Sequence, residues 1–257
     1  MKLKVLEKEK MSMTFVMEGI TEAIANTLRR LVINEVPTLA IEDVAIQKNS
    51  SAMYDEMLAH RLGLVPLKTD LKSYKTKEEC ACKGKGCAQC TLTITLKAKG
   101  PGSVYSSQLE SKDPKVTAAQ ETIPIVRLTK NQEVKVEATA ILGKGKTHMK
   151  FSPGLMYYQG YPTITIEKKT GVKKCIEACN DNLTEKGDQL IIKDFKKWND
   201  ACEEICEQNG MKITTSKEDF IFTLESWGQL QPKEILLKAL DVYEDKLDEF
   251  AKLVKQL

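Results

Sequence analysis

The stretch LAHRLGLVPL, residues 58–67, is the most specific pattern in this sequence and separates two different parts of it. Residues 54–63 predict a short helix that ends at Gly63, because glycine readily adopts the left-handed conformation that closes many helices. An apolar segment, residues 64–67, follows directly. Strands and a helix are expected before this stretch, and a cysteine-rich loop with further strands is expected after it.

The N-terminal part predicts strands at residues 2–7, 11–17 and 39–46, with a helix at residues 21–36 that Pro37 ends. This helix has an apolar stripe on one side and two arginines on the other. The stripe consists of Ile20, Ile24, Leu28, Leu31 and Val32, and the arginines are Arg29 and Arg30.

The part after residue 90 alternates apolar and polar residues in several short segments, which is typical of half-buried strands. Residues 103–114 are polar and predict a loop. The mixture of strands and helices indicates an α+β chain. The expected strands are 91–98, 123–128, 134–142, 163–167 and 220–224.

The last helix, expected from Pro232 to the end of the chain, carries apolar residues in alternating steps of four and three. This spacing forms a seam like that of a coiled coil. Most amphipathic helices lie on their own sheet, but this seam reaches the last residue, which favours a partner helix. Its members are Leu236, Leu240, Tyr243, Leu247, Phe250, Val254 and Leu257.

The composition is that of an ordinary globular protein: 257 residues, 42% apolar, 29% charged, with a net charge of +3. It argues against disorder, a nucleic-acid clamp and a membrane span, and the charged N-terminus predicts a cytoplasmic chain. No catalytic motif is present, and His60 and His148 have no metal-ligand spacing. A basic turn at Lys144, Lys146 and Lys150 is expected to be solvated, with phosphate contact as the alternative.

Eight cysteines form two sets of four. The first set, Cys80, Cys82, Cys87 and Cys90, lies within one loop that also contains two glycines. Four thiolates on such a loop predict one closed, structural zinc site, and Lys77, Lys83 and Lys85 would favour thiolates. The alternative is a reduced, exposed loop without metal.

The second set consists of two C-x3-C pairs within a short internal repeat: Cys175 and Cys179, then Cys202 and Cys206. Helical spacing puts both sulfurs of a pair on one face. The pairs resemble the last two cysteines of each cluster-binding run in bacterial-type ferredoxins, where the last cysteine serves the other cluster. That resemblance implies that Cys175 lies near Cys206 and that Cys179 lies near Cys202.

Only two cysteines would remain at each such cluster site, so we expect no iron–sulfur cluster. The pairs would be reduced or disulfide-bonded. The alternative is one cluster or one zinc ion, held by a further ligand or by all four sulfurs together.

Several segments resemble the RNA polymerase alpha-like subunits. Residues 26–31 (NTLRRL) with Val36 and Pro37 resemble the first helix of that family, and residues 58–67 are very similar to a signature of its archaeal and eukaryotic members. Residues 222–228 (FTLESWG) and the helix after them resemble its C-terminal element. The cysteine loop resembles the zinc loop of the third-largest-subunit class, and the ferredoxin-like insertion resembles the archaeal D-type members.

The resemblance implies three domains. A discontinuous dimerisation domain would comprise residues 1–47, 150–168 and 213–257. A β-rich insert domain with the zinc loop would comprise residues 48–149. A small, degenerate ferredoxin-like domain would comprise residues 169–212.

The resemblance also implies a non-catalytic assembly platform of DNA-directed RNA polymerase. The chain would pair with the small alpha-like subunit L and dock the zinc subunits N and P and the large catalytic subunits, reaching DNA only through the complex. The implied residues of the heterodimer interface are Ile24, Leu28, Leu31, Val32, Leu240, Leu247, Phe250 and Val254. Candidates for large-subunit contacts are Arg29, Arg30, His60 and Arg61, the last two alternatively packing within the insert domain.

Two other functions remain open from the residues alone. One is a redox or electron-transfer protein that uses the second cysteine set. The other is a homodimeric zinc-binding interaction module unrelated to transcription.

Overall fold

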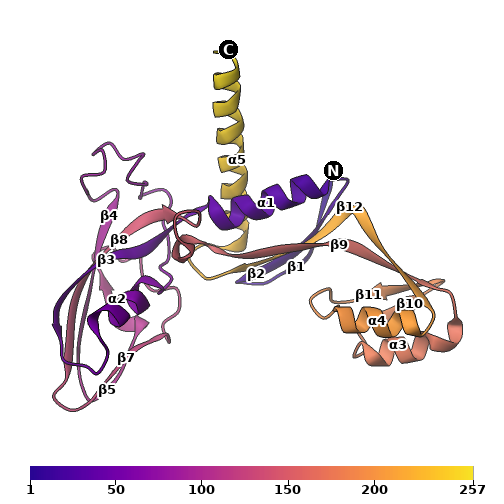
Figure 1. Ribbon diagram of the computed structural model, residues 1–257, viewed down its shortest axis with the longest axis horizontal. Helices are drawn as coiled ribbons and strands as arrows, with labels where there is room; N and C mark the ends of the chain where they lie inside the picture. Colours follow the sequence, from indigo (N-terminus) through magenta and orange to yellow (C-terminus); the bar gives the residue numbers. More distant parts are fainter. Residues whose placement is uncertain (257) are drawn as a thin grey trace. The chain divides into compact units, whose positions relative to one another are not determined.

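The computed structural model describes residues 1–256 and shows an α+β chain (Figure 1). The helices are α1 (Glu22–Asn34), α2 (Asp55–Gly63), α3 (Val172–Ala178), α4 (Asp200–Gln208) and α5 (Pro232–Val254). The strands are β1 (Lys2–Lys8), β2 (Ser12–Glu18), β3 (Pro37–Asn49), β4 (Thr91–Lys99), β5 (Gly102–Tyr105), β6 (Leu109–Ser111), β7 (Pro124–Leu128), β8 (Glu133–Lys144), β9 (Gly154–Ile166), β10 (Leu183–Lys186), β11 (Gln189–Ile192) and β12 (Met211–Ser226). Short 3₁₀ turns are η1 (Ser106–Gln108), η2 (Met149–Phe151) and η3 (Lys169–Gly171).

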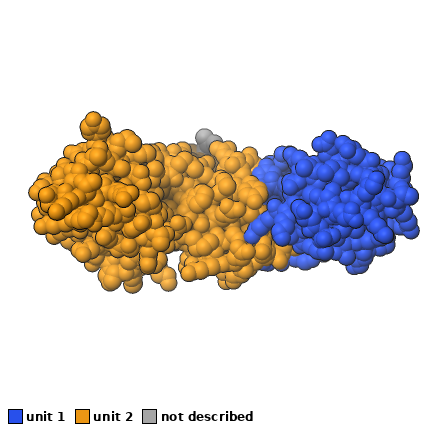
Figure 2. All heavy atoms as spheres, turned by 90° about the horizontal axis from the view of Figure 1, so that it is seen from below, with its two compact units in different colours: residues 1–5, 15–25, 158–222 blue, residues 6–14, 26–157, 223–257 orange. Residues whose placement is uncertain are grey.

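Two compact units make up the chain (Figure 2). The first unit consists of residues 1–5, 15–25 and 158–222, and the second of residues 6–14, 26–157 and 223–257. Strands β1, β2, β9 and β12 contribute residues to both units, and they belong to one six-stranded sheet of order β1-β2-β12-β9-β11-β10.

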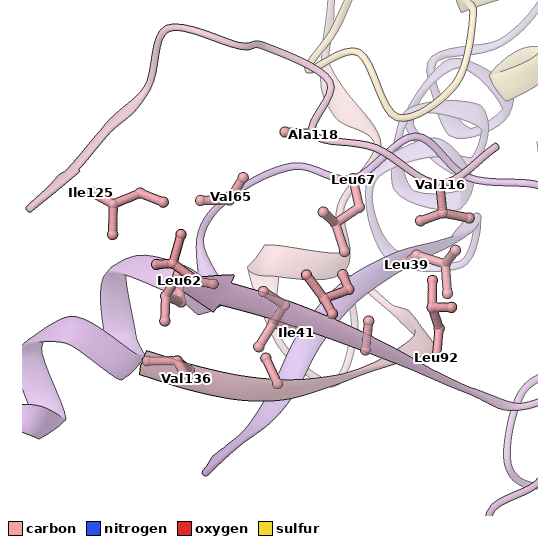
Figure 3. Packing of buried hydrophobic residues seen from close by; sticks show 14 of the residues in the cluster. Leu39, Ile41, Leu62, Val65, Leu67, Leu92, Val116, Ala118, Ile125 and Val136 are labelled. Carbon is pink, nitrogen blue, oxygen red and sulfur yellow. The ribbon is translucent and has the colours of Figure 1, made fainter. Parts of the chain in front are cut away.

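The second unit contains a four-stranded antiparallel sheet, β3-β8-β4-β6, and a two-stranded ribbon, β5-β7. Leu58 and Leu62 of α2 are completely buried against this sheet, because their i, i+4 spacing puts both on one helix face. Val65 and Leu67 enter the same core, which Figure 3 shows around Leu39, Ile41, Leu92 and Val136. The stretch at residues 58–67 therefore supplies one wall of this core.

The helix expected at residues 54–63 is confirmed, but its ending differs from the expectation. Gly63 is the last helical residue and is not left-handed. Instead, Leu64 keeps a helical conformation, and its N–H donates to the carbonyls of His60 and Arg61. A tightened last turn thus closes α2.

The first unit contains a small module built from α3, α4 and the hairpin β10–β11. Gly187, with φ of +64°, lies in the hairpin turn, where a left-handed residue is required. Leu183 pairs with Ile192 across the hairpin, and both are buried with the cysteines of the two helices.

Helix α5 is firmly anchored only at its beginning. Pro232 occupies the first turn, and Gln231 and Glu234 form a capping box. Its buried residues are Pro232, Ile235 and Ala239. Figure 1 shows the later turns extending away from the strands of the second unit. Leu257, the last expected member of the seam, lies outside the described residues.

The largest differences from the expected elements are in strand length. The strands expected at 163–167 and 220–224 are the ends of much longer strands, β9 and β12. The expected loop at 103–114 contains β5 and β6, and β6 forms because it pairs with β4 at Ile94–Ser111. The hairpin β10–β11 was not expected at all.

Candidate metal centre and subunit interface

Four sulfurs meet in the loop between α2 and β4. The Sγ atoms of Cys80 and Cys82 are 3.4 Å apart, and those of Cys80 and Cys87 are 3.5 Å apart. Cys90 Sγ lies 3.5 Å from that of Cys82 and 3.8 Å from that of Cys87. All four lie within 4.8 Å of one another. The sequence-predicted ligand set is thus gathered at one point.

Tight turns bring these sulfurs together. The N–H of Lys83 donates to the carbonyl of Cys80 at 2.9 Å, and the N–H of Cys90 donates to that of Cys87 at 2.9 Å. Gly84 and Gly86 have φ of +77° and +87°, values that favour glycine. The N–H of Cys87 also donates to Cys90 Sγ at 3.3 Å, which stabilises a thiolate there.

The geometry fits a tetrahedral thiolate site. Four sulfurs that each lie about 2.3 Å from a zinc ion are separated by roughly 3.8 Å, close to the distances observed here. With four protein ligands, such a site has no position for substrate, so its role would be structural. The thiols of this set differ in acidity. The pKa of Cys82 is lowered to about 6, chiefly by its side-chain hydrogen bond with Cys80, whereas burial raises the pKa of Cys90.

The second cysteine set lies in the core of the small module. A disulfide joins Cys175 and Cys206, whose Cα atoms are 4.8 Å apart. Cys179 and Cys202 are free and buried. The Sγ of Cys179 is 3.8 Å from that of Cys206, and burial, followed by a hydrogen bond with Cys202, raises the pKa of Cys179 to about 12. The structure therefore joins Cys175 to Cys206, the first pair that the ferredoxin resemblance implies, and places Cys179 close to this disulfide.

The exposed apolar residues of α5 form the most prominent candidate interface. Phe250 is 65% exposed, and Leu240, Leu247 and Val254 are each about half exposed. Leu237, Tyr243 and Leu253 are exposed as well, although Leu237 and Leu253 do not belong to the seam expected from the sequence. We call these seven residues the α5 face.

The apolar stripe of α1 does not behave as one surface. Ile24 is 48% exposed and Leu28 is half-buried, but Leu31 and Val32 are buried within the chain. Val32 has no accessible surface left, so it cannot contribute directly to a partner interface, contrary to expectation. Ala25 is also fully buried. The inward side of α1 is therefore rotated relative to the expected stripe.

Comparison with known proteins identifies the family to which this chain belongs. The family described as RNA polymerase Rpb3/RpoA insert domain matches residues 41–156. The chain is 38% identical to DNA-directed RNA polymerase subunit Rpo3 of Methanosarcina acetivorans, over 100% of this chain and 99% of that protein. The chain belongs to the Rpo3 family. The chain is also 36% identical to the Rpo3 subunit of Archaeoglobus fulgidus, over 99% of this chain and 98% of that protein. It is 35% identical to the Rpo3 subunit of Pyrococcus horikoshii, over 100% of this chain and 98% of that protein.

Membership of the Rpo3 family confirms the resemblance to the archaeal D-type members and makes the chain a subunit of DNA-directed RNA polymerase. It is thus part of a nucleotidyltransferase complex. Within residues 1–256, no helix is both long and apolar enough to span a membrane.

The four polar contact candidates of this Rpo3 chain differ in their availability. Arg30 and His60 are exposed. Arg29 already makes a hydrogen bond within α1, because its Nη2 donates to Asn26 Oδ1 at 2.9 Å. Arg61 is exposed but donates to the carbonyl of Pro124 at 2.6 Å. Arg61 therefore already joins α2 to β7, while His60 has its side chain at the surface.

One lysine of the turn that was expected to be solvated, Lys150, contacts other residues of the chain instead of solvent. Lys150 Nζ donates to the carbonyl of Ile41 at 2.9 Å, pairs with Glu42 and lies 5.1 Å from the ring centroid of Phe151. Its side chain is only 13% exposed. Lys150 is therefore a tether between η2 and β3, and Lys146 is left exposed at the turn.

Proposed function

We propose that this chain is the non-catalytic assembly platform of an archaeal RNA polymerase, pairing with the small alpha-like subunit L. In this proposal, the zinc subunits N and P and the large catalytic subunits dock on the resulting heterodimer. DNA is bound elsewhere in the complex.

The α5 face is the observation that carries this proposal. The seven apolar side chains of this face are each 41–65% exposed, and six of them lie beyond Ala239, the last residue of α5 that the chain buries. Scattered single apolar residues are normal on a surface, but a contiguous apolar stripe on a helix marks an interaction site. A partner helix packed along the seam would bury these side chains.

The remaining interface members fit a secondary role. Ile24 offers half of its surface and Leu28 a smaller part, whereas Leu31 and Val32 support α1 from inside. We therefore assign the direct contacts to Ile24, Leu28 and the α5 face. Leu31 and Val32 act by fixing the position of α1.

We further propose three domains with the boundaries given above: a discontinuous dimerisation domain, the insert domain and the ferredoxin-like module. The family match at residues 41–156 supports an insert domain in the middle of the chain. The strands β1, β2, β9 and β12 come from distant parts of the sequence and share one sheet, which supports a discontinuous domain.

For the cysteine loop we propose one structural zinc ion held by Cys80, Cys82, Cys87 and Cys90. The loop between α2 and β4 places only a few apolar side chains in the core, such as Tyr74. Metal binding would then supply the stabilisation that burial cannot. The polar contacts to a large subunit would come from Arg29, Arg30 and His60.

The test is co-expression with an L-type subunit followed by measurement of molar mass in solution. The platform proposal expects a 1:1 complex and self-association of the chain when it is alone. A monodisperse homodimer that ignores L would instead support a homodimeric zinc module. A monomer with a reversible thiol potential and no affinity for L would support a redox protein.

A further inference from the structure

The four cysteines of the small module form a continuous row of buried sulfurs. Cys175 is bonded to Cys206, Cys206 Sγ is 3.8 Å from Cys179 Sγ, and Cys179 shares a side-chain hydrogen bond with Cys202. The Sγ atoms of Cys175, Cys179 and Cys206 all lie within 4.8 Å of one another. Three sulfurs are therefore gathered at one point, and Cys202 interacts with one of them, Cys179, from outside this group.

Two short helices hold the row in place. Cys175 lies in α3, and Cys179 is the residue that follows the last turn of this helix. Cys202 and Cys206 lie one turn apart on α4, which packs against α3. Asn199 caps α4 by accepting from the N–H of Cys202 at 3.0 Å. Cys202 is thus in the first turn of α4.

The row lies within an apolar core. All four cysteines are at most 6% exposed, and apolar side chains surround them. These neighbours are Val172, Leu183, Leu190, Ile192, Trp198 and Met211. Within the described residues, the groups able to hold a metal that gather at this point are all cysteines. A purely sulfur donor set selects soft or borderline ions such as Zn²⁺ and disfavours Mg²⁺ and Ca²⁺.

We propose that reduction of the Cys175–Cys206 disulfide converts this row into a second metal site, in which all four thiolates bind one soft divalent ion. The site is different from a ferredoxin cluster site, because it combines the two half-sets into one mononuclear centre. The separation of Cys179 and Cys206 already equals the roughly 3.8 Å expected between sulfurs around tetrahedral zinc.

The chemistry balances as two steps. A cellular dithiol gives two electrons and two protons to the Cys175–Cys206 bond and becomes a disulfide itself, which leaves four thiols in the module. One divalent ion then displaces four protons to form four metal–sulfur bonds. The disulfide and the metal site use the same two sulfurs, so they exclude each other, and metal occupancy follows the redox state of the module.

The experiment uses the full chain with Cys82→Ser and Cys87→Ser, so that the loop in the other unit no longer provides four ligands. One sample keeps the disulfide, verified by peptide mapping. The other is reduced anaerobically with a phosphine, which takes the oxygen of one water as the disulfide becomes two thiols. Both are titrated with Co²⁺, whose tetrahedral thiolate complexes absorb strongly in the visible range.

The proposal expects one tightly bound Co²⁺ per reduced chain and none in the disulfide form. Adding Cys179→Ser and Cys202→Ser should weaken binding by at least about tenfold. Equal binding by both redox forms, or no binding by the reduced form, would overturn the proposal. Stoichiometric iron with labile sulfide in anaerobically purified protein would also overturn it, since that result means a cluster. The comparison of the two redox forms needs no variant of the module itself.

Discussion

The exposed face of α5 makes a quantitative prediction about partner binding. We consider Leu247→Ala with Phe250→Ala, and the harsher pair Leu247→Asp with Phe250→Asp. Leu247 is 50% exposed and Phe250 is 65% exposed, so half or more of each side chain remains to be buried by a partner. Both lie beyond the turns of α5 that the chain buries.

Complete burial of a leucine or phenylalanine contributes about 1.5–3 kcal/mol. The half to two-thirds still exposed at these positions is therefore worth about 1–2 kcal/mol each, or about 2–4 kcal/mol for the alanine pair. At about 1.4 kcal/mol for each factor of ten, the dissociation constant should rise roughly 30-fold to several hundred-fold. The aspartate pair should abolish binding, because each carboxylate would be buried without a partner charge.

The assay is titration of the L-type subunit against the full chain by calorimetry, together with thermal unfolding of the chain alone. Met57→Asp is the matched control, since Met57 is 55% exposed but lies on α2. The control should bind L normally. The α5 variants should unfold within about 0.5 kcal/mol of the unchanged chain, as expected for surface positions. Unchanged binding of the aspartate pair would refute the proposed interface, and a large loss of stability would show that the α5 face packs internally.

Three further predictions concern other parts of the chain. Cys87→Ser, or a strong chelator, should remove one zinc ion and increase amide exchange in the loop before β4, as measured by mass spectrometry, whereas Ser107→Ala should leave the zinc content unchanged. Tyr74 donates to Asp113 at 2.8 Å, and burial, followed by this bond, raises its pKa to about 12; its contribution, about 1–2 kcal/mol relative to Tyr74→Phe, should be present below about pH 10 and be lost as pH rises towards 12, and a pH-independent difference between the two proteins would contradict it. Gly154→Ala should cost about 1–3 kcal/mol, because its Cβ would collide with the carbonyl of Glu225, whereas Gly187→Asn, in an open turn with φ of +64°, should be nearly neutral in chemical denaturation.

Features specified by local sequence were predictable. The loop cysteines lie within eleven residues, so their spacing and two glycines were enough to predict that the four sulfurs meet. Helix α2 was equally predictable, because Leu58 and Leu62 mark its buried face. Its ending was not, since Leu64 satisfies the last carbonyls without a left-handed glycine. A helix can end with a left-handed glycine or with a tightened last turn. Gly63 made the first ending the expected one, but the structure has the second.

Features that depend on distant partners were not predictable. β6 is a polar segment that forms a strand only because Leu109 and Ser111 pair with β4. Similarly, the first half of β12 has an exposed, polar pattern and forms a strand through its neighbours in the six-stranded sheet. The burial of Val32 has the same origin: periodicity shows that α1 has an apolar side, but only the surrounding strands determine which residues of that side face inward.

The distribution of burial along α5 supports the proposed partner interface. Only the first third of the helix is fixed by the body of the chain, through Pro232, Ile235 and Ala239. Isolated helical segments of fewer than about 12–15 residues are marginal in water, and their stability normally comes from packing. Beyond Ala239, Lys246 pairs with Glu35 at 3.0 Å, and because the lysine side chain is 48% exposed the pair contributes about 1 kcal/mol or less. In the proposed heterodimer, the apolar side chains of the later turns would form one half of a hydrophobic core, and the partner would supply the other half.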